Sequence, residues 1–480
     1  MTELKPENVF RFFSEINNVP RPSGKSEKII AYLKAFAIER GLEHEVDEAG
    51  NVIIRKPATP GMEGKEGVIL QSHTDMVCEK NKDLDFDFEN QAIQTYIDGE
   101  WMKAKGTTLG ADDGIGMALS LAALDSQDIV HGPLECLFTS DEETGLDGAF
   151  AIKPGFMKGK YLINLDSEDE GEIYIGCAGG QNTKAVFTYE TESVPAGYFT
   201  IRINIDGLCG GHSGDDIVKK RANANKLMAR FLYSSMKKYD LRIIELTGGN
   251  LHNAIPRYSS ALIAIPSAHK EDIRVDFNVF ASEIEDEFHT TEKTLNFTMQ
   301  SENTSSEAIE KTTARRIIMA LHAVHNGVYE MSQDIDGIPE TSSNIASIRM
   351  NDGTLTVISS QRSMTLSSRL CEQEAIEAAF LLAGAEVTTN GGYPGWKPNL
   401  DSHLLQTAIS SYKTLYGNEP KVKVIHAGLE CGLFTEKYPH LELISAGPTM
   451  RGVHSPDERL HIPSVELVWK LMLEILKNLS

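Results

Sequence analysis

The sequence predicts an α/β protein: a mostly parallel sheet with helices on both faces, interrupted by an inserted α+β domain. Three observations lead to this fold class. Short apolar strands alternate with helices up to residue 184, strands with alternating apolar and polar positions follow, and the first pattern returns after residue 385. The chain therefore divides into residues 1–184, 185–385 and 386–480, of which the first and last form one domain.

The first part begins with two helices and continues with buried strands. Apolar residues recur three and four positions apart in residues 6–18 and 25–41, which is the spacing of a helix face. Apolar runs then predict three strands, with a helix between the first two: residues 67–73, 134–139, 160–166 and 114–124.

The middle part, residues 185–385, is interpreted as two similar α+β halves of roughly a hundred residues each. Half-exposed strands at 198–206 and 260–267 enclose a long helix at 219–238. A strand, a helix and a strand then follow again: residues 295–300, 310–327 and 353–363. The last part of the chain predicts a helix, two strands and a final helix: residues 402–417, 421–428, 441–447 and 464–479.

The composition limits the class of partner. The 480-residue chain has a net charge of −23, whereas phosphate contact requires clustered Lys and Arg, so nucleic acid is not expected as a partner. The negative net charge also has an ordinary explanation, because it keeps a cytosolic protein soluble. The N-terminus lacks the features of a signal peptide, and no apolar run approaches the ~20 residues of a membrane span. Six scattered cysteines fit reduced thiols, so we expect a cytoplasmic protein without a membrane partner.

Histidine and carboxylate side chains stand where the predicted strands end. They are His73 and Asp75 after the first strand, Glu142 and Glu143 after the second, Asp166 after the third, His454 after the last, and Asp112 and Asp113 where a helix begins. Each has an ordinary explanation alone: a histidine at a strand end, an aspartate that caps a helix, or acids that face water. Because ligands of parallel α/β sheets bind at the carboxyl ends of the strands, a metal site explains all of them together.

A two-metal hydrolytic site would use these side chains in different ways. Two ions ~3.5–4 Å apart polarise a carbonyl and lower the pKa of a shared water, and a carboxylate that is not a ligand takes the proton of that water. One member of the pair Glu142–Glu143 suits metal binding and the other suits the base. Asp75 is suited to hold the second ring nitrogen of His73. The sequence contains neither GxSxG nor GxxxxGK[ST], so a serine hydrolase and a nucleotide-binding protein are not expected.

The motifs HTD, GADDG, DEETG, INLD and GPTMRGVHSP resemble those of the co-catalytic zinc metallopeptidases, a family that includes carboxypeptidase G, aminoacylase and tripeptidase. Longer stretches, such as HTDMVCEKN, DSEDEGEIYIGCAGG and HSPDERL, resemble the Xaa-His (aminoacyl-histidine) dipeptidase branch of that family. The resemblance runs from about residue 8 to residue 478.

The resemblance implies a role for each strand-end residue. His73 and Asp166 would bind the first metal, Glu143 and His454 the second, and Asp112 would bridge them, while Glu142 would be the general base and Asp75 the acid behind His73. It implies a cytosolic dinuclear zinc dipeptidase acting on short unblocked dipeptides, with cobalt or manganese as possible substitutes. An aminoacylase- or tripeptidase-type enzyme of the same family, or a metal-binding protein without activity, are the alternatives.

The resemblance also implies that the inserted domain is a lid that reaches over the active site. His212 would stabilise the oxyanion, although the glycines around it also fit a turn. Asn253, Asn344 and Arg362 would hold a substrate carboxylate. Glu430 would lie near the free amine of the substrate or be a buried structural carboxylate. The second half of the lid would supply what a partner subunit supplies in simpler relatives, and a homodimer also remains possible.

Overall fold

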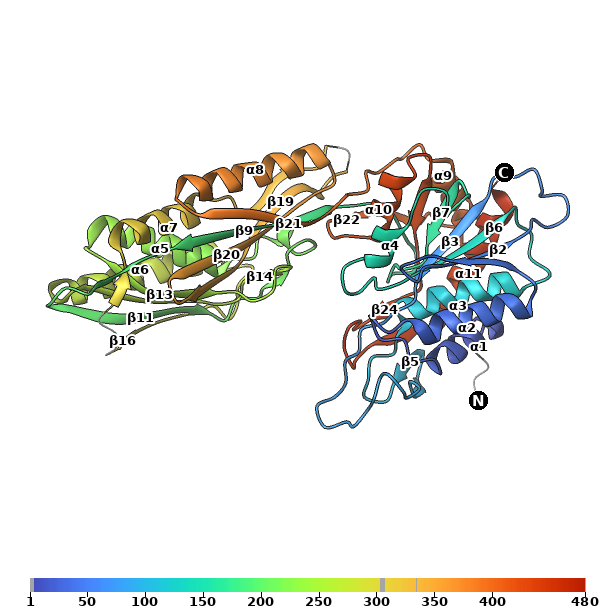
Figure 1. Ribbon diagram of the computed structural model, residues 1–480, viewed down its shortest axis with the longest axis horizontal. Coiled ribbons are helices and arrows are strands. Elements are labelled where there is room, and N and C mark those ends of the chain that lie inside the picture. The colour runs from blue at the N-terminus through green and yellow to red at the C-terminus, as the bar shows by residue number, and fades with distance from the viewer. Residues whose placement is uncertain (1–3, 303–306, 334, 480) are drawn as a thin grey trace. The chain divides into compact units, whose positions relative to one another are not determined.

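The computed structural model describes residues 4–302, 307–333 and 335–479, which form two compact units (Figure 1). Unit 1 comprises residues 1–176, 396–424 and 429–480, and unit 2 comprises residues 177–395 and 425–428. Among the described residues, no helix is long and apolar enough to cross a membrane. The structure is an α/β protein with a mixed, mostly parallel sheet and a separate antiparallel sheet. The domain boundaries expected from the sequence stay a prediction.

Unit 1 is built on an eight-stranded sheet with the order β1-β2-β6-β3-β7-β23-β8-β22. Its strands are β1 (Glu43–Val46), β2 (Val52–Lys56), β3 (Val68–His73), β6 (Leu134–Thr139), β7 (Tyr161–Asn164), β8 (Glu172–Cys177), β22 (Lys421–Ile425) and β23 (Glu442–Ser445). A four-stranded sheet contains β4 (Thr95–Asp98), β5 (Trp101–Ala104), β24 (Met450–Arg451) and β25 (Arg459–His461). The helices are α1 (Glu7–Asn17), α2 (Glu27–Glu39), α3 (Ala111–Asp125), α4 (Asp147–Ala151), α9 (His403–Tyr416), α10 (Glu430–Lys437) and α11 (Ile462–Asn478).

The centre of this sheet is parallel and fully buried. Strand β3 runs parallel to β6 and β7, and β7 runs parallel to β23. Every residue of β3 and β6 is buried, which is why apolar residues in both strands are adjacent rather than strictly alternating with polar ones. Helix α3 packs on β3 and β6, and α9 packs on β23. The carboxyl ends of β3, β6 and β7 therefore meet at one edge of the sheet.

Unit 2 contains a nine-stranded sheet with the order β16-β11-β15-β13-β19-β20-β9-β21 and β18 paired to β19. Its strands are β9 (Gly179–Thr188), β11 (Tyr198–Asp206), β13 (Arg242–Gly248), β15 (Ser259–Pro266), β16 (Asn296–Ser301), β18 (Gly327–Met331), β19 (Pro339–Asn351), β20 (Thr354–Ser363) and β21 (Glu386–Tyr393). Two short pairs add β10 (Thr191–Ser193) with β17 (Glu307–Ile309), and β12 (Gly211–His212) with β14 (Ala254–Ile255). The α-helices are α5 (Ala224–Lys238), α6 (Lys270–Glu287), α7 (Lys311–Ala323) and α8 (Leu366–Leu382), with short 3-10 turns at η1 (Ile217–Lys219) and η2 (Ser267–His269).

These helices pack on the nine-stranded sheet through one hydrophobic core that alternate residues of the strands supply (Figure 1). Residues 295–300, expected to open a second half, form β16 and pair with β11 instead. The strand itself is confirmed, but its assignment to the second half is wrong, because a strand that begins a repeat and one that completes it carry the same local pattern. Helices α6 and α8 had no counterpart in the sequence analysis, whereas the helices expected at residues 6–18, 25–41 and 402–417 are confirmed as α1, α2 and α9.

Candidate metal centre

Five side chains reach the edge where the parallel strands end. His73 is the last residue of β3, and Asp166 lies just beyond β7. Glu143 is in the loop after β6, Asp112 is in the first turn of α3, and His454 is between β24 and β25. Parallel strands end at the same edge of a sheet, so the topology explains the places of His73, Glu143 and Asp166. Asp112 and His454 come from elements outside these strands.

Asp112 connects the two imidazoles of the cluster. Its Oδ1 lies 2.9 Å from Nε2 of His73, and its Oδ2 lies 3.1 Å from Nε2 of His454. Nε2 of His454 is also 3.1 Å from Oε2 of Glu143, and Nε2 of His73 is 3.7 Å from Oδ1 of Asp166. One aspartate carboxylate thus faces a histidine–aspartate pair on one side and a histidine–glutamate pair on the other.

Asp113, by contrast, caps the helix. Its Oδ1 accepts a hydrogen bond of 3.0 Å from the backbone N–H of Gly116, and the residue is fully buried. A Cβ at Gly116 would lie 2.2 Å from that oxygen, so only glycine leaves room for the cap. The peptide bond that joins Asp112 and Asp113 is cis. The capping explanation therefore applies to Asp113, whereas the carboxylate of Asp112 faces the two imidazoles.

Asp75 connects His73 with the loop after β6. Its Oδ1 lies 3.4 Å from Nδ1 of His73 and accepts from the backbone N–H of Glu142 at 3.0 Å. Its Oδ2 accepts from the hydroxyl of Ser23 at 2.7 Å and from the N–H of Glu143 at 3.3 Å. Although burial alone would raise it, these partners lower the pKa of Asp75 to about 2. The ionised carboxylate therefore lies next to the imidazole of His73 and accepts from the backbone N–H groups of both glutamates.

The cluster carries more negative charge than its own side chains neutralise. The pKa of His454 is raised to about 11 by its hydrogen bonds to Asp112 and Glu143. Burial would lower the pKa of His73, but the carboxylates of Asp166 and Asp112 raise it well above its usual range. Burial and the charge of Asp112 raise the pKa of Asp166. The site thus attracts positive charge, which protons or metal cations can supply.

The donor set fits metal ions. Ligand atoms of His73, Asp112 and Glu143 lie within 4.8 Å of one another. Oε1 of Glu143 is buried, and it has no hydrogen-bond partner in the part of the chain that the structure describes. Imidazole nitrogen and carboxylate oxygen are ligands that zinc accepts. Since an unpaired buried carboxylate oxygen is costly, a metal ion would satisfy an atom that the fold leaves free.

Glu142 and Glu143 differ in their surroundings. The Glu143 carboxylate contacts His454, as described above, and it belongs with His73 and Asp112 to the group of mutually close ligand atoms. Glu142 is outside this group, as are Asp166 and His454. Burial and the neighbouring carboxylates of Glu430 and Glu143 raise the pKa of Glu142 well above its usual range, against an opposing effect of His73. A carboxyl group with a raised pKa next to a metal centre suits proton transfer.

In unit 2, the structure brings His212 and Arg362 together. Nη2 of Arg362 lies 3.5 Å from Nε2 of His212, and Nη1 donates to the hydroxyl of Tyr393 at 2.9 Å. Burial and the charge of Arg362 lower the pKa of His212 to about 4, so its imidazole is neutral at pH 7. Asn253 is exposed, and its carbonyl accepts from the N–H of Ser213.

Asn344 and Glu430 are buried and hydrogen bonded. The amide of Asn344 donates to the carbonyl of Ala254 at 2.8 Å, and its oxygen accepts from Asn223 at 3.0 Å. Oε2 of Glu430 accepts from Gln71 at 2.7 Å and from Thr139 at 3.0 Å. Each has the surroundings of a structural polar group, and their proposed contacts with substrate stay predictions.

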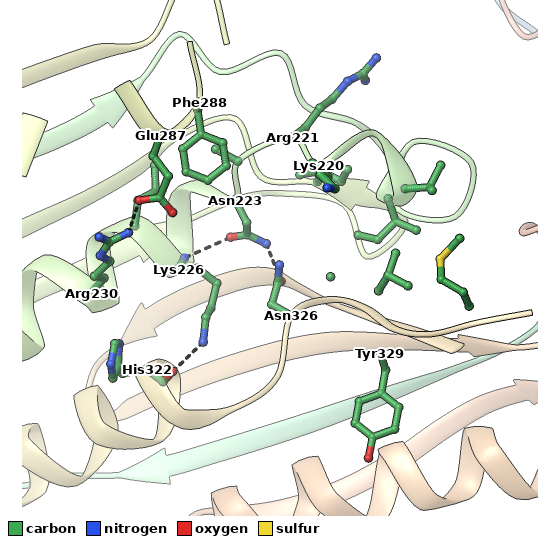
Figure 2. Close-up of a pocket in the computed structure, with 18 residues that line it drawn as sticks. Lys220, Arg221, Asn223, Lys226, Arg230, Glu287, Phe288, His322, Asn326 and Tyr329 are labelled. Atoms are coloured by element: carbon green, nitrogen blue, oxygen red, sulfur yellow. Dashed lines mark hydrogen bonds and ion pairs between the residues drawn. The ribbon is translucent and has the colours of Figure 1, made fainter. Parts of the chain in front are cut away.

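Unit 2 also contains a cavity of about 790 Å³ lined by basic side chains (Figure 2). Arg230 pairs with Glu287 at 2.6 Å, and Lys226 donates to the last carbonyls of α7, including that of His322 at 2.8 Å. Asn223 donates to Asn326 at 2.9 Å across the cavity wall. These contacts satisfy Arg230 and Lys226, two of the basic side chains that line the cavity.

Two buried residues of unit 1 were missed by the sequence analysis. Arg21, 1% exposed, donates to the carbonyls of Thr74 and Asp75, and Glu458 accepts from the loop that carries Asp112. The sequence signals for these two residues were weak. Arg21 stands between two prolines, and Glu458 is an acidic residue four positions after His454.

A model of the peptidase family M20/M25/M40 matches residues 69–478. A cytosol non-specific dipeptidase of Escherichia coli (strain K12) is 42% identical over 479 residues, which cover 100% of this chain and 99% of the relative.

Two solved structures extend the comparison. The aminoacylhistidine dipeptidase from Vibrio alginolyticus is 44% identical, with a TM-score of 0.93 and coverage of 99% of this chain and 97% of the other. The aminopeptidase PepT from Bacillus cereus ATCC 10987 is 16% identical, with a TM-score of 0.59 and 99% coverage of both chains, so it shows a shared fold alone.

Proposed function

Because the chain belongs to the peptidase family M20/M25/M40, we propose that it is a cytosolic dinuclear zinc dipeptidase. Its substrates are short unblocked dipeptides, Xaa-His among them. The names of the two full-length relatives, which are 42% and 44% identical, support the dipeptidase activity. The name of the 44% identical relative, an aminoacylhistidine dipeptidase, supports Xaa-His peptides as substrates. The family supports a requirement for metal ions.

One observation carries the proposal: the carboxylate of Asp112 lies 2.9 Å from His73 and 3.1 Å from His454. A carboxylate between two ligand pairs is the arrangement that a bridged pair of metal ions requires. We assign His73 and Asp166 to one ion, Glu143 and His454 to the other, and Asp112 to both.

Bound zinc would polarise the scissile carbonyl and acidify the attacking water. Glu142 then accepts the proton of that water and gives it to the leaving amine, for which its raised pKa is suited. Asp75 keeps His73 and the backbone of Glu142 in place. Water attack thus needs no nucleophilic side chain.

For unit 2 we propose a lid made of two similar α+β halves, attached to a catalytic domain with helices on both faces of its sheet. The strand orders β16-β11-β15-β13 and β21-β9-β20-β19 support the repeat, because equivalent strands occupy equivalent places. We propose that His212, Asn253, Asn344 and Arg362 bind substrate, and that Glu430 lies near its free amine. A homodimer is a separate proposal that sedimentation analysis can test.

Metal analysis combined with a substrate panel tests the function. We expect close to two zinc ions per chain, loss of activity after chelation, and recovery with zinc, cobalt or manganese. The panel contains Xaa-His and other dipeptides, a β-alanyl-histidine peptide, tripeptides and N-acetyl amino acids, and we expect cleavage of the free dipeptides.

Two results would contradict the proposal. Hydrolysis that survives complete removal of metal would exclude the metal-dependent chemistry. Preferred cleavage of N-acetyl amino acids or tripeptides would instead keep the metal centre and assign the chain to an aminoacylase- or tripeptidase-type specificity.

A further inference from the structure

Glu458 joins two loops of the metal centre through a set of backbone hydrogen bonds. The residue directly precedes β25, and it is 2% exposed. Its Oε2 accepts from the N–H groups of Leu109 and Gly110 at 2.7 and 3.0 Å. Its Oε1 accepts from those of Ala111 and Asp112 at 2.8 and 3.3 Å. One carboxylate therefore binds four successive N–H groups.

These N–H groups belong to the start of α3. The first N–H groups of a helix lack acceptors within the helix, and a neighbouring Ser, Thr, Asp or Asn side chain usually accepts from them. At α3 the capping position is Gly110, whose φ is 68° and which has no side chain. The backbone of Asp112 and Asp113 is not helical, and Asp113 caps the helix that continues after it. Glu458 thus supplies, from a distant part of the chain, the acceptors for the turn at residues 109–112 that precedes this helix.

The same hydrogen bonds act on the two ligand loops at once. Glu458 is four residues after His454, and its carboxylate holds the backbone N–H of Asp112. The side chain of Asp112 in turn lies 3.1 Å from the imidazole of His454. The loop of His454 and the loop of Asp112 are therefore connected twice, once through side chains at the site and once through Glu458 behind it.

A buried guanidinium secures the opposite side of the Asp112 loop. Nη2 of Arg21 donates to the carbonyl of Gly110, while Nη1 donates to the carbonyl of Asp75 at 2.6 Å. A Cβ at Gly110 would lie 2.6 Å from Nη2 of Arg21 and 2.9 Å from the sulfur of Met76. With its N–H groups bound by Glu458 and its carbonyl bound by Arg21, the loop has little freedom to move.

We propose that Glu458 is a positioning residue of the metal centre, which holds Asp112 and His454 at the spacing that lets both contact one metal ion. The inference rests on the proposed function, because it takes Asp112 and His454 as ligands. A role limited to capping α3 would instead affect the stability of the fold and leave metal affinity unchanged.

The variant Glu458→Gln separates these roles. Glutamine has the same size, but its NH2 group would face the N–H donors that now meet an oxygen. We expect a folded chain whose zinc affinity, measured by competition with a chromogenic chelator, falls about 10- to 100-fold, as is common when a group behind a ligand is changed. We also expect kcat to fall while KM changes little. Asp457→Asn is the control, because it removes an exposed carboxylate from the same loop.

Glu458→Asp keeps the charge and shortens the side chain by one methylene group. If Glu458→Gln does not fold, the zinc affinity of Glu458→Asp shows whether Glu458 positions the ligands or only caps α3. Hydrogen exchange of the unaltered chain adds a test without substitution: we expect slow exchange at residues 109–112 with and without zinc.

Three outcomes would overturn the inference. Zinc affinity in both Glu458 variants equal to that of the unaltered chain would leave only a capping role. Fast exchange at residues 109–112 would show that the loop is not held. An unaltered chain that binds no zinc would refute the proposed function as well.

Discussion

At the scale of the residue, the contacts that a carboxylate makes depend more on its place in the backbone than on its residue type. Asp112 and Asp113 are adjacent and chemically identical, yet one lies between two imidazoles and the other binds the N–H of Gly116. Likewise, Glu143 contacts His454 whereas Glu142 does not belong to the group of close ligand atoms. Each pair thus provides one candidate ligand, and the other carboxyl group has different surroundings.

The division between Glu142 and Glu143 leads to a prediction. Glu142→Ala should keep both metal ions and lower kcat by about 10²- to 10⁴-fold, the range that general acid–base catalysis contributes. Metal content and steady-state kinetics on the same preparation measure both effects. Asp147→Ala, which removes an exposed carboxylate from the same region, should keep normal activity. A Glu142→Ala chain with full metal and full activity would remove Glu142 from the mechanism.

At the scale of the element, the hydrogen bonds that Glu310 accepts at the start of helix α7 make the stability of the fold depend on pH. Glu310 precedes the helix, and its carboxylate accepts from the N–H groups of Thr312 and Thr313 at 2.7 and 2.8 Å. These hydrogen bonds favour the charged form and lower the pKa of Glu310 from 4.5 to about 2.

A carboxyl group with a lowered pKa stabilises the folded state fully above its unfolded pKa and loses this effect as the pH falls toward its folded pKa. We therefore expect Glu310→Gln to lower the unfolding temperature at pH 7, with a difference that shrinks between pH 4.5 and pH 2. Thermal unfolding followed by circular dichroism over this range measures it. Glu285→Gln, in an exposed position of α6, is the control. An effect that does not depend on pH would show that the charge of Glu310 is not involved.

At the scale of the whole molecule, the candidate ligands all belong to unit 1, whereas unit 2 has a hydrophobic core of its own. A ligand that binds only the folded state stabilises the part of the chain that binds it. Zinc should therefore slow amide exchange around residues 73–75 and 142–143, and leave the core strands of unit 2 unchanged. Exchange measured with and without zinc tests this, and equal protection of both units would contradict it.

The candidate ligands and most of the long elements were predictable from the sequence. His73, Asp112, Glu143 and His454 stand beside apolar runs or glycine-rich turns, and helices such as α1 and α9 have apolar faces with a clear period. These signals are local, because burial of a strand or of a helix face requires apolar residues at fixed spacing. Helices α6 and α8 were missed, since exposed apolar residues such as Val275 and Leu382 weaken the pattern.

What the sequence alone determined about this protein is its set of reactive groups and the class of sheet that brings them to one edge. The tertiary structure decided what each group contacts: that Asp113 rather than Asp112 caps α3, that β16 pairs with β11, and that Arg21 and Glu458 hold the Asp112 loop. Glu458 and Ala111 are 347 residues apart. A contact over that distance depends on the path of the whole chain, and no local pattern of residues encodes it.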